Sequence, residues 1–346
     1  MKILVLNANH DRYSLGWSYT RAFESLGHEV KMIDPVERLS QWKFWSNRYT
    51  RRILERPIVE AFNKQWLQEL IADPVDLIWV GKGAWAVPWL WRQLKEKRPD
   101  VHLVCFNGDD PLENYSRGGN RPWVTDSISC FDLFCTYNSH LVDRLYEADA
   151  RNVACVPFAW DPDIHPTQPY GAFERDLLFI GNGDTHRAQW LRHILSCPAA
   201  KHWKVSIYGK WAKAMCRSFS DRVIHRHVFG LEMAKLIASS RITLNILRVQ
   251  NEGSHNMRTF ETPGCGGLLA SQFSNEQSHF LNGEDANQRG ALLVSDPEEC
   301  VDQIERHLRD PKLCESIARI GTARVADQTY QRRAEQTLDA LGIASC

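Results

Sequence analysis

Residues 251–267, NEGSHNMRTFETPGCGG, combine side chains and backbone features suited to binding a diphosphate. The segment follows the strand-like run ITLNIL and leads into a short predicted helix, Arg258–Cys265. The unpaired N–H groups at a helix start attract anions, because they carry the positive end of the helix dipole. We expect Asn256 to cap this helix by accepting a hydrogen bond from the amide near Thr259. The pattern predicts an anion-binding helix start.

Two opposite charges lie three residues apart on this predicted helix. Arg258 and Glu261 share one helix face, so they can act together. In a binding site, Arg258 would hold a diphosphate and Glu261 would accept hydrogen bonds from the two ribose hydroxyls. The alternative is an ordinary surface ion pair. We predict that the donor-binding residues of this segment are His255, Asn256, Arg258, Thr259 and Glu261.

Two further strand ends carry polar residues. In FIGNGDTHR, a strand ends in a Gly-Asn-Gly turn and a helix follows, with Arg187 in its first turn. A cation there is unfavourable unless an anion binds nearby, so we predict that Asn182 and Arg187 contact a diphosphate. In IYGKW, Lys210 follows a strand and could neutralise a leaving diphosphate together with Arg258. The alternatives are an ordinary strand–turn–helix and a solvated lysine.

Candidate catalytic groups lie in the first half of the chain. FNGDDP places Asp109 and Asp110 just after a predicted strand, and His10 follows the first strand. Asp109 and Asp110 could recognise the acceptor or deprotonate it, as an inverting transfer requires, and His10 and Asp11 are rival candidates for the base. A retaining transfer could instead pass the proton to the leaving phosphate. Adjacent aspartates on an extended chain point apart, so no metal site is predicted. Asp-Asp-Pro is also ordinary turn chemistry.

The elements that must position these residues alternate between strand and helix, which predicts parallel sheets with crossover helices. Residues 156–169 contain four prolines and are expected to form a stiff linker. We therefore predict an α/β protein with two Rossmann-like, doubly wound domains that face a central cleft. The expected ranges are 1–160 for an acceptor domain, 161–328 for a donor domain, and 329–346 for a last helix. The predicted strands are Lys2–Asn7, Glu29–Asp34, Asp76–Val80, His102–Asn107, Asp132–Thr136, Asn152–Val156, Asp176–Ile180, Lys204–Tyr208, Ile242–Leu247, Leu268–Ser271 and Ala291–Val294.

Composition excludes several classes of protein. The 346 residues carry no net formal charge, so a protein that coats nucleic acid is not expected. The ten cysteines are scattered without a C-x-x-C pair, which argues against zinc and against a disulfide framework. The start resembles a first strand rather than a signal peptide, and no run approaches the roughly 18 apolar residues of a membrane span. We expect a cytoplasmic protein whose thirteen tryptophans mostly fill cores.

One segment suggests a further partner. Residues 38–56, RLSQWKFWSNRYTRRILER, are basic and aromatic. Such a segment can lie on an anionic membrane surface or grip a lipid-linked acceptor. The simpler expectation is a solvated helix whose aromatic side packs on the domain.

Several of these motifs together resemble the glycosyltransferase family that includes spore maturation protein CgeB. They are HNMRTFE, CGGLL, FLNGED and ERHLRDPKLCESIARIGTARVADQTYQRR, with WVGKG and FNGDDP in the first half. The resemblance implies a GT-B fold, sugar transfer from a nucleotide donor, and a final helix that returns to the first domain. It also implies that HVFG, with Phe229 and Gly230, approaches the base, and it favours uridine. Many retaining GT-B enzymes carry two glutamates one residue closer together than Glu252 and Glu261.

The expected function is transfer of a sugar from a nucleoside diphosphate sugar, with no metal or other cofactor. The acceptor could be a glycan, a lipid-linked saccharide, a protein or a small molecule. A nucleotide-sugar epimerase is the first alternative, and it would form an altered free sugar without an acceptor. A non-catalytic nucleotide-binding protein is the second, and it would bind without turnover. A dehydrogenase is disfavoured, because G-N-G-D-T-H lacks the third glycine of the dinucleotide fingerprint.

Overall fold

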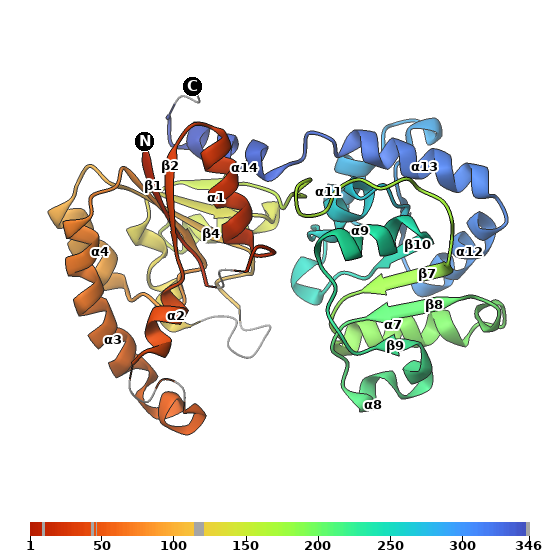
Figure 1. Ribbon diagram of the computed structural model, residues 1–346, viewed down its shortest axis with the longest axis horizontal. Coiled ribbons are helices and arrows are strands. Elements are labelled where there is room, and N and C mark those ends of the chain that lie inside the picture. The colour runs from red at the N-terminus through yellow and green to blue at the C-terminus, as the bar shows by residue number, and fades with distance from the viewer. Residues whose placement is uncertain (9–10, 43–44, 46, 114–120, 344–346) are drawn as a thin grey trace. The chain divides into compact units, whose positions relative to one another are not determined.

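The computed structural model describes residues 1–8, 11–42, 45, 47–113 and 121–343. The chain divides into two compact units. The first contains Met1–Pro157 and Tyr330–Cys346, and the second contains Phe158–Thr329. Each unit holds one six-stranded parallel sheet with helices around it (Figure 1). The α/β class with two doubly wound sheets is therefore confirmed.

The sheet of the first unit has the order β2-β1-β3-β4-β5-β6. All neighbouring strands run parallel, as crossover connections require. Its strands are β1 (Lys2–Leu6), β2 (Glu29–Ile33), β3 (Leu77–Gly81), β4 (His102–Asn107), β5 (Leu133–Thr136) and β6 (Val153–Cys155). Its helices are α1 (Leu15–Ser25), α2 (Pro35–Ser40), α3 (Arg48–Ala72), α4 (Pro88–Lys97), α5 (Pro122–Thr125), α6 (Val142–Glu147) and α14 (Tyr330–Ala340).

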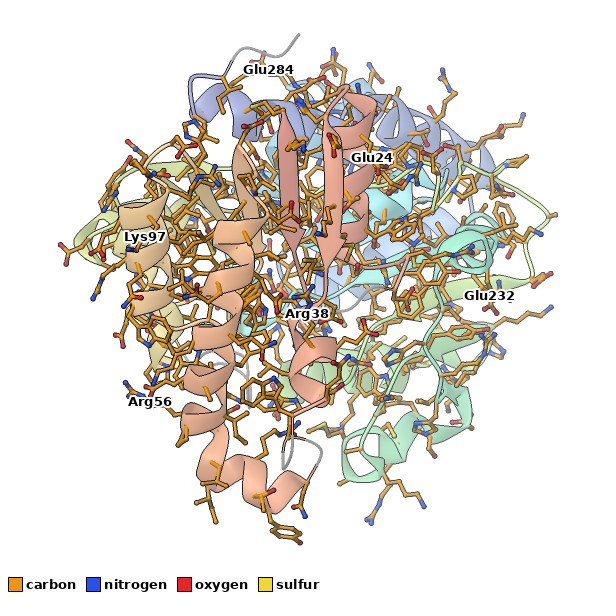
Figure 2. The ribbon with its side chains drawn as sticks, turned by 60° about the vertical axis from the view of Figure 1, so that its left-hand side comes forward. Glu24, Arg38, Arg56, Lys97, Glu232 and Glu284 are labelled. Atoms are coloured by element: carbon orange, nitrogen blue, oxygen red, sulfur yellow. The ribbon has the colours of Figure 1, made fainter. Side chains whose placement is uncertain are left out.

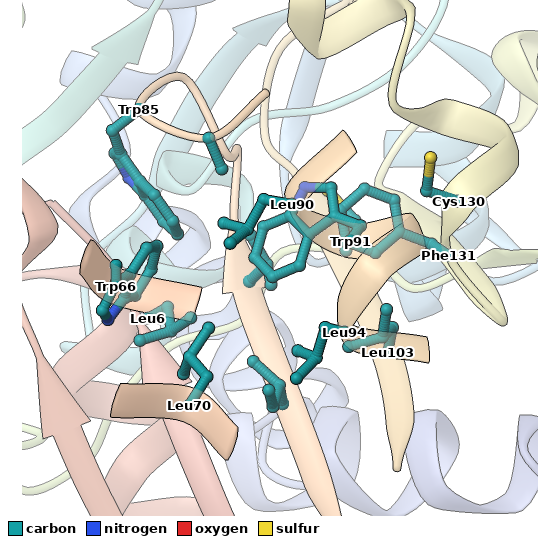
Figure 3. Packing of buried hydrophobic residues seen from close by; sticks show 14 of the residues in the cluster. Leu6, Trp66, Leu70, Trp85, Leu90, Trp91, Leu94, Leu103, Cys130 and Phe131 are labelled. Carbon is teal, nitrogen blue, oxygen red and sulfur yellow. The ribbon is translucent and has the colours of Figure 1, made fainter. Parts of the chain in front are cut away.

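Tryptophans fill the core between α3, α4 and the sheet of the first unit. Trp66 packs against Trp85 with ring centroids 5.0 Å apart, and Trp91 packs against Phe131 at 5.5 Å (Figure 3). Trp66 and Trp91 are fully buried, as is Trp79 in β3. Large aromatic rings bury much apolar area, so these residues stabilise the unit rather than form a sugar platform.

The last helix completes the first unit, although it is remote in sequence. α14 lies against α1 (Figure 1). Tyr330 at its start contacts Tyr19 of α1 edge-on, with ring centroids 5.6 Å apart. Arg333 and Leu338 of α14 are buried. The helix therefore contributes core residues to this unit.

The sheet of the second unit has the order β12-β11-β10-β7-β8-β9, again all parallel. The edge strand β9 has two residues, too few for a sequence pattern, and it was not predicted. The strands are β7 (Arg175–Ile180), β8 (Val205–Tyr208), β9 (Val223–Ile224), β10 (Ser240–Asn245), β11 (Leu269–Gln272) and β12 (Leu292–Val294). The helices are α7 (Thr185–Ser196), α8 (Lys213–Cys216), α9 (Gly230–Ala238), α10 (Arg258–Gly264), α11 (Asn275–Leu281), α12 (Pro297–Leu308) and α13 (Pro311–Arg324).

The proline-rich segment 156–169 is not the plain linker that was expected. From Phe158 onward it belongs to the second unit. The indole of Trp160 is buried and donates a hydrogen bond to the carbonyl of Val325 at 3.0 Å. The hydroxyl of Thr167 donates to the carbonyl of Gly264 at 2.8 Å. Prolines prevent regular backbone pairing, but they do not prevent apolar side chains from being buried.

In the basic and aromatic segment 38–56, one aromatic side chain is packed against the domain and two apolar side chains are exposed to solvent. Trp42 packs edge-on against Phe62, as the simpler expectation requires. Tyr49 and Ile53, on the first turns of α3, are instead 82% and 79% exposed. Residues 43, 44 and 46 lie outside the described part of the chain. No helix within the described ranges is both long and apolar enough to cross a lipid bilayer.

Candidate nucleotide-binding site

A pocket of about 240 Å³ opens at the carboxyl ends of β7 and β8 in the second unit. Ligands of open α/β sheets bind at this edge. Aromatic and aliphatic side chains form much of its wall, and the side chain of Arg258 adds a charge. The lining residues are Ile180, Gly181, Asn182, Tyr208, Gly209, His227, Val228, Phe229 and Arg258. A wall of this composition suits a ligand with a flat ring at one end and an anion at the other.

The loops after β7 and β8, which contribute Asn182 and Gly209 to the pocket wall, are held together by hydrogen bonds. The side-chain oxygen of Asn182 accepts a hydrogen bond from the N–H of Lys210 at 3.0 Å. The N–H of Gly183 donates to the carbonyl of Lys210 at 3.0 Å. Gly209 has a φ of +139°, and a Cβ there would lie 2.2 Å from the carbonyl oxygen of Gly181. Only glycine permits this approach, so IYGKW contains a positioning residue that the sequence analysis overlooked.

Arg187 binds protein backbone rather than facing the pocket. Its Nε donates to the carbonyl of Ile246 at 2.9 Å, and Nη1 donates to the carbonyl of Asn182 at 3.1 Å. Burial, with a smaller contribution from the charge of Arg248, lowers the pKa of Arg187 to about 10, so it stays a cation at neutral pH. The sequence analysis predicted that Arg187 contacts the diphosphate directly. Its hydrogen bond to the carbonyl of Asn182 instead supports a role in holding Asn182 in place. The side chain of Lys210 is exposed beyond β8.

The ion pair of Arg258 and Glu261 is internal. Both residues lie on α10, and their side chains are 19% and 4% exposed. Burial lowers the pKa of Arg258 to about 10, which still leaves the guanidinium charged at neutral pH. The alternative of an ordinary surface pair is therefore wrong. Arg258 contributes to the pocket wall, and Glu261 lies one helical turn further along the same face.

Asn256 does not cap α10. Met257 occupies the N-cap position, without a side-chain cap. The amide of Asn256 pairs with that of Asn245 instead, through hydrogen bonds of 2.9 and 3.2 Å. The hydroxyl of Thr259 donates to Gln277 at 3.0 Å. The capping prediction failed because a polar partner from β10 competes for the Asn256 side chain.

His255 is fully buried, and both of its ring nitrogens have partners. Its Nε2 accepts a hydrogen bond from the N–H of Phe158 at 3.1 Å. Its Nδ1 lies 2.7 Å from the carboxylate of Glu276. These bonds fix the tautomer with the proton on Nδ1. His255 therefore ties the start of the second unit to the loop before α10, and a direct contact with a donor, as predicted, does not fit this geometry.

Other pocket residues come from the loop before α9. Phe229 is 43% exposed at the rim and meets the ring of His227 edge-on, with centroids 5.9 Å apart. Gly230, with a φ of +60°, begins α9. The HVFG motif was recognised in the sequence, but His227 was not singled out within it.

His165 is a second residue that sequence reasoning missed. Its imidazole is buried, and neither ring nitrogen has a hydrogen-bond partner within the described ranges. Its Nδ1 lies 4.0 Å from a carboxylate oxygen of Glu261. Burial, followed by the charge of Arg258, lowers the pKa of His165 to about 3. The residue lies in the proline-rich segment, where no local pattern signals a site.

The predicted catalytic aspartates have different surroundings. Asp109 is half-buried, and one of its carboxylate oxygens lies 2.5 Å from the Nζ of Lys82. Asp110 is buried, accepts from the N–H of Leu112 at 2.8 Å and pairs with Arg144 at 3.0 Å. Its geometry is that of a turn residue. His10, the third candidate, lies outside the described residues.

No group of three or more His, Cys, Asp or Glu side chains that could hold a metal ion occurs within the described ranges.

We compared the chain with known protein families, curated sequences and solved structures. Residues 187–339 match a family model described as glycosyl transferase-like. A search of curated protein sequences gives no match. The chain is similar to the solved sucrose-phosphate synthase from Thermosynechococcus elongatus, with a TM-score of 0.69 at 12% identity, over 99% of this chain and 98% of that one.

Two solved complexes are also similar to this chain. One is described as trehalose-6-phosphate from E. coli bound with UDP-2-fluoro glucose, with a TM-score of 0.66 at 12% identity over 99% and 100% of the two chains. The other is Anabaena HepE in complex with UDP-glucose, with a TM-score of 0.63 at 12% identity over 98% and 100%. At this level of identity the likeness shows the GT-B fold. The family match over residues 187–339 and this fold together support a glycosyltransferase enzyme.

Proposed function

We propose that this protein is a metal-independent glycosyltransferase that takes a sugar from a nucleoside diphosphate sugar, with UDP favoured, and belongs to the CgeB-like group. The observation that carries the proposal is Arg258, a buried cation that lines an aromatic pocket at the carboxyl ends of β7 and β8. The similar structures solved with UDP-glucose and UDP-2-fluoro glucose support the choice of donor.

In this proposal, different residues bind the base, the diphosphate and the ribose of the nucleotide donor. The base stacks near Phe229 and Tyr208, whose rings belong to the pocket wall. The diphosphate pairs with Arg258, and the ribose hydroxyls donate to Glu261. As the bond to the sugar breaks, negative charge grows on the diphosphate, and a preorganised cation stabilises it. Lys210, exposed beyond β8, adds a second positive charge. These two permanent cations are the reason for proposing that the reaction needs no metal.

We assign the acceptor to the first unit, with Asp109 as the group that deprotonates its hydroxyl. Asp109 is partly exposed after β4, whereas Asp110 is tied to Arg144. The acceptor class that we favour is a saccharide or lipid-linked saccharide. Tyr49 and Ile53 are exposed on α3, the helix that also carries Arg56 (Figure 2), and their exposure supports peripheral contact with an anionic membrane.

We place the protein in the cytoplasm. The nine cysteines within the described residues are all free thiols, and seven of them are buried. Free thiols persist in a reducing compartment, which supports this placement.

Thermal denaturation with UDP, GDP, CDP, dTDP and NADH, with and without EDTA, tests the donor class. A ligand that binds the native state raises its melting temperature. We expect one nucleoside diphosphate to stabilise the protein equally with and without EDTA. Stabilisation by NADH alone would overturn the proposal. Incubation with the matching nucleotide sugar then separates transfer from epimerisation, since an epimerase releases an altered sugar without any acceptor.

A further inference from the structure

The donor site contains three titratable groups close together, and one of them has no hydrogen-bond partner among the described residues. Arg258 and Glu261 form an ion pair, while His165 lies beside them with its Nδ1 4.0 Å from the other carboxylate oxygen of Glu261. The His165 side chain is 8% exposed. Buried polar groups nearly always have hydrogen-bond partners, so an unpartnered buried imidazole needs a physical explanation.

The proposed function creates a conflict that His165 can resolve. A diphosphate competes with Glu261 for the guanidinium of Arg258, because both are anions. Once Arg258 turns to the diphosphate, Glu261 would remain a buried carboxylate without its counter-charge, which is costly. A distance of 4.0 Å is too long for a hydrogen bond, so such a bond requires a side-chain rotation of His165 or Glu261.

We propose that His165 is a positioning residue that donates a hydrogen bond from Nδ1 to Glu261 while Arg258 binds the donor's diphosphate. This inference rests on the proposed function. One carboxylate oxygen of Glu261 then accepts from His165, and the other is held toward the ribose hydroxyls. A neutral imidazole suits this role, because it orients the carboxylate without neutralising the negative charge that the ribose hydroxyls require.

The packing around His165 supports a fixed orientation. Its backbone N–H donates to the carbonyl of Asp161 at 2.8 Å, and its carbonyl lies near the thiol of Cys265 at the end of α10. The side chain of Asp161 in turn accepts from the N–H groups of Asp163 and Ile164 at 3.1 and 3.3 Å. The segment that carries His165 is therefore folded against the helix that carries Arg258 and Glu261.

The test compares binding of UDP and GDP with that of their 2′-deoxy counterparts by calorimetry. In the wild-type protein, the ribonucleotide should bind more tightly, because Glu261 accepts from the 2′-hydroxyl. His165→Leu removes the hydrogen-bonding group Nδ1–H and puts an apolar side chain of similar size in its place. We expect it to weaken ribonucleotide binding about tenfold and to reduce the preference over the 2′-deoxy form. His165→Asn places an amide N–H near the position of Nδ1 and should restore most of that preference.

If His165 had only a structural role, His165→Leu would weaken the binding of the ribonucleotide and of its 2′-deoxy form equally. The preference for the ribonucleotide over the 2′-deoxy form therefore decides between the two roles. A wild-type preference retained in His165→Leu would overturn the inference and leave the proposed function intact. Absence of binding by the wild-type protein to either nucleoside diphosphate would overturn both. Should His165→Leu fail to fold, His165→Gln provides the second comparison. In a Glu261→Gln background, His165→Leu should no longer alter the preference, and an additive effect there would also contradict the inference.

Discussion

Arg258 and Glu261 lie one turn apart on α10 and form an ion pair, with the guanidinium in the wall of a pocket and the carboxylate almost fully enclosed. A second arginine–glutamate pair in the same unit, Arg309 and Glu305, lies on the surface with side chains 80% and 32% exposed. The two pairs make a matched comparison of a site pair with a surface pair.

Replacing Arg258 by alanine should abolish nucleotide binding and also destabilise the second unit. Removing one member of a buried pair leaves the other uncompensated, at a cost of about 3–5 kcal/mol. Glu261→Gln should weaken binding with a smaller loss of stability, because the amide oxygen can still accept a hydrogen bond from Arg258, whose side chain is 19% exposed. Arg309→Ala should change neither property appreciably, since exposed pairs contribute little. Calorimetric binding and urea denaturation measure both properties, and unchanged affinity in Arg258→Ala would refute the site.

Gly209→Ala should strongly destabilise the loops after β7 and β8. The added Cβ would lie 2.2 Å from the carbonyl oxygen of Gly181, in addition to the strain of a positive φ. We expect a loss above about 1–3 kcal/mol and no measurable nucleotide binding. Gly27→Ala is the control, because Gly27 also has a positive φ but nothing lies within 4 Å of its added Cβ. Denaturation curves of the two variants should differ clearly, and equal losses would show that the close approach is unimportant.

Asp109→Asn should slow sugar transfer with little effect on donor affinity. A general base typically contributes about 10²–10⁴-fold in rate. Asp110→Asn should act mainly on stability, since Asp110 is buried and paired with Arg144. Steady-state kinetics with UDP-glucose and a saccharide acceptor would separate these effects. If Asp109→Asn retains the full kcat, the proton must pass to another group, such as the leaving phosphate.

The stability of the protein should fall as the pH is lowered from about 6.5 toward 3. In the unfolded chain His165 takes up a proton near its ordinary pKa of 6.5, whereas in the folded protein burial lowers that pKa to about 3. The unfolded state therefore binds more protons in this window, and stability falls by up to about 1.4 kcal/mol per pH unit for one such group. His165→Leu should flatten this slope in urea titrations at successive pH values. If the dependence of stability on pH is the same in His165→Leu as in the wild type, a group other than His165 is responsible for it.

Tyr49→Ser with Ile53→Ser should abolish binding to vesicles that contain anionic phospholipid. The two side chains lie four residues apart on one exposed helix face and can insert beside arginines that attract the lipid. Tyr146→Ser, which removes an exposed aromatic residue elsewhere on the first unit, is the control. Co-sedimentation at low and high salt measures the effect. Equal sedimentation of the double variant and the wild type would exclude this surface.

The sequence by itself determined the fold class and most of the strands. Val5 and Leu6 in β1 and Leu177 and Leu178 in β7 lie in short apolar runs, and such runs followed by polar turns specify buried parallel strands through local patterning alone. The sequence also located the main segments of the pocket, because glycines and a cation that directly follow a strand indicate an anion-binding turn. Arg258, Asn182 and Phe229, all identified from motifs, do line the pocket.

Only the tertiary structure decided which polar groups are free to meet a ligand. Asn256 pairs with Asn245 on the preceding strand β10, and His255 bonds to Phe158, which lies 97 residues earlier in the chain. Likewise, His165 reaches Glu261 because a proline-rich segment folds against α10. Hydrogen bonds and ion pairs depend on distances of a few ångströms between remote segments, and local periodicity carries no information about those distances.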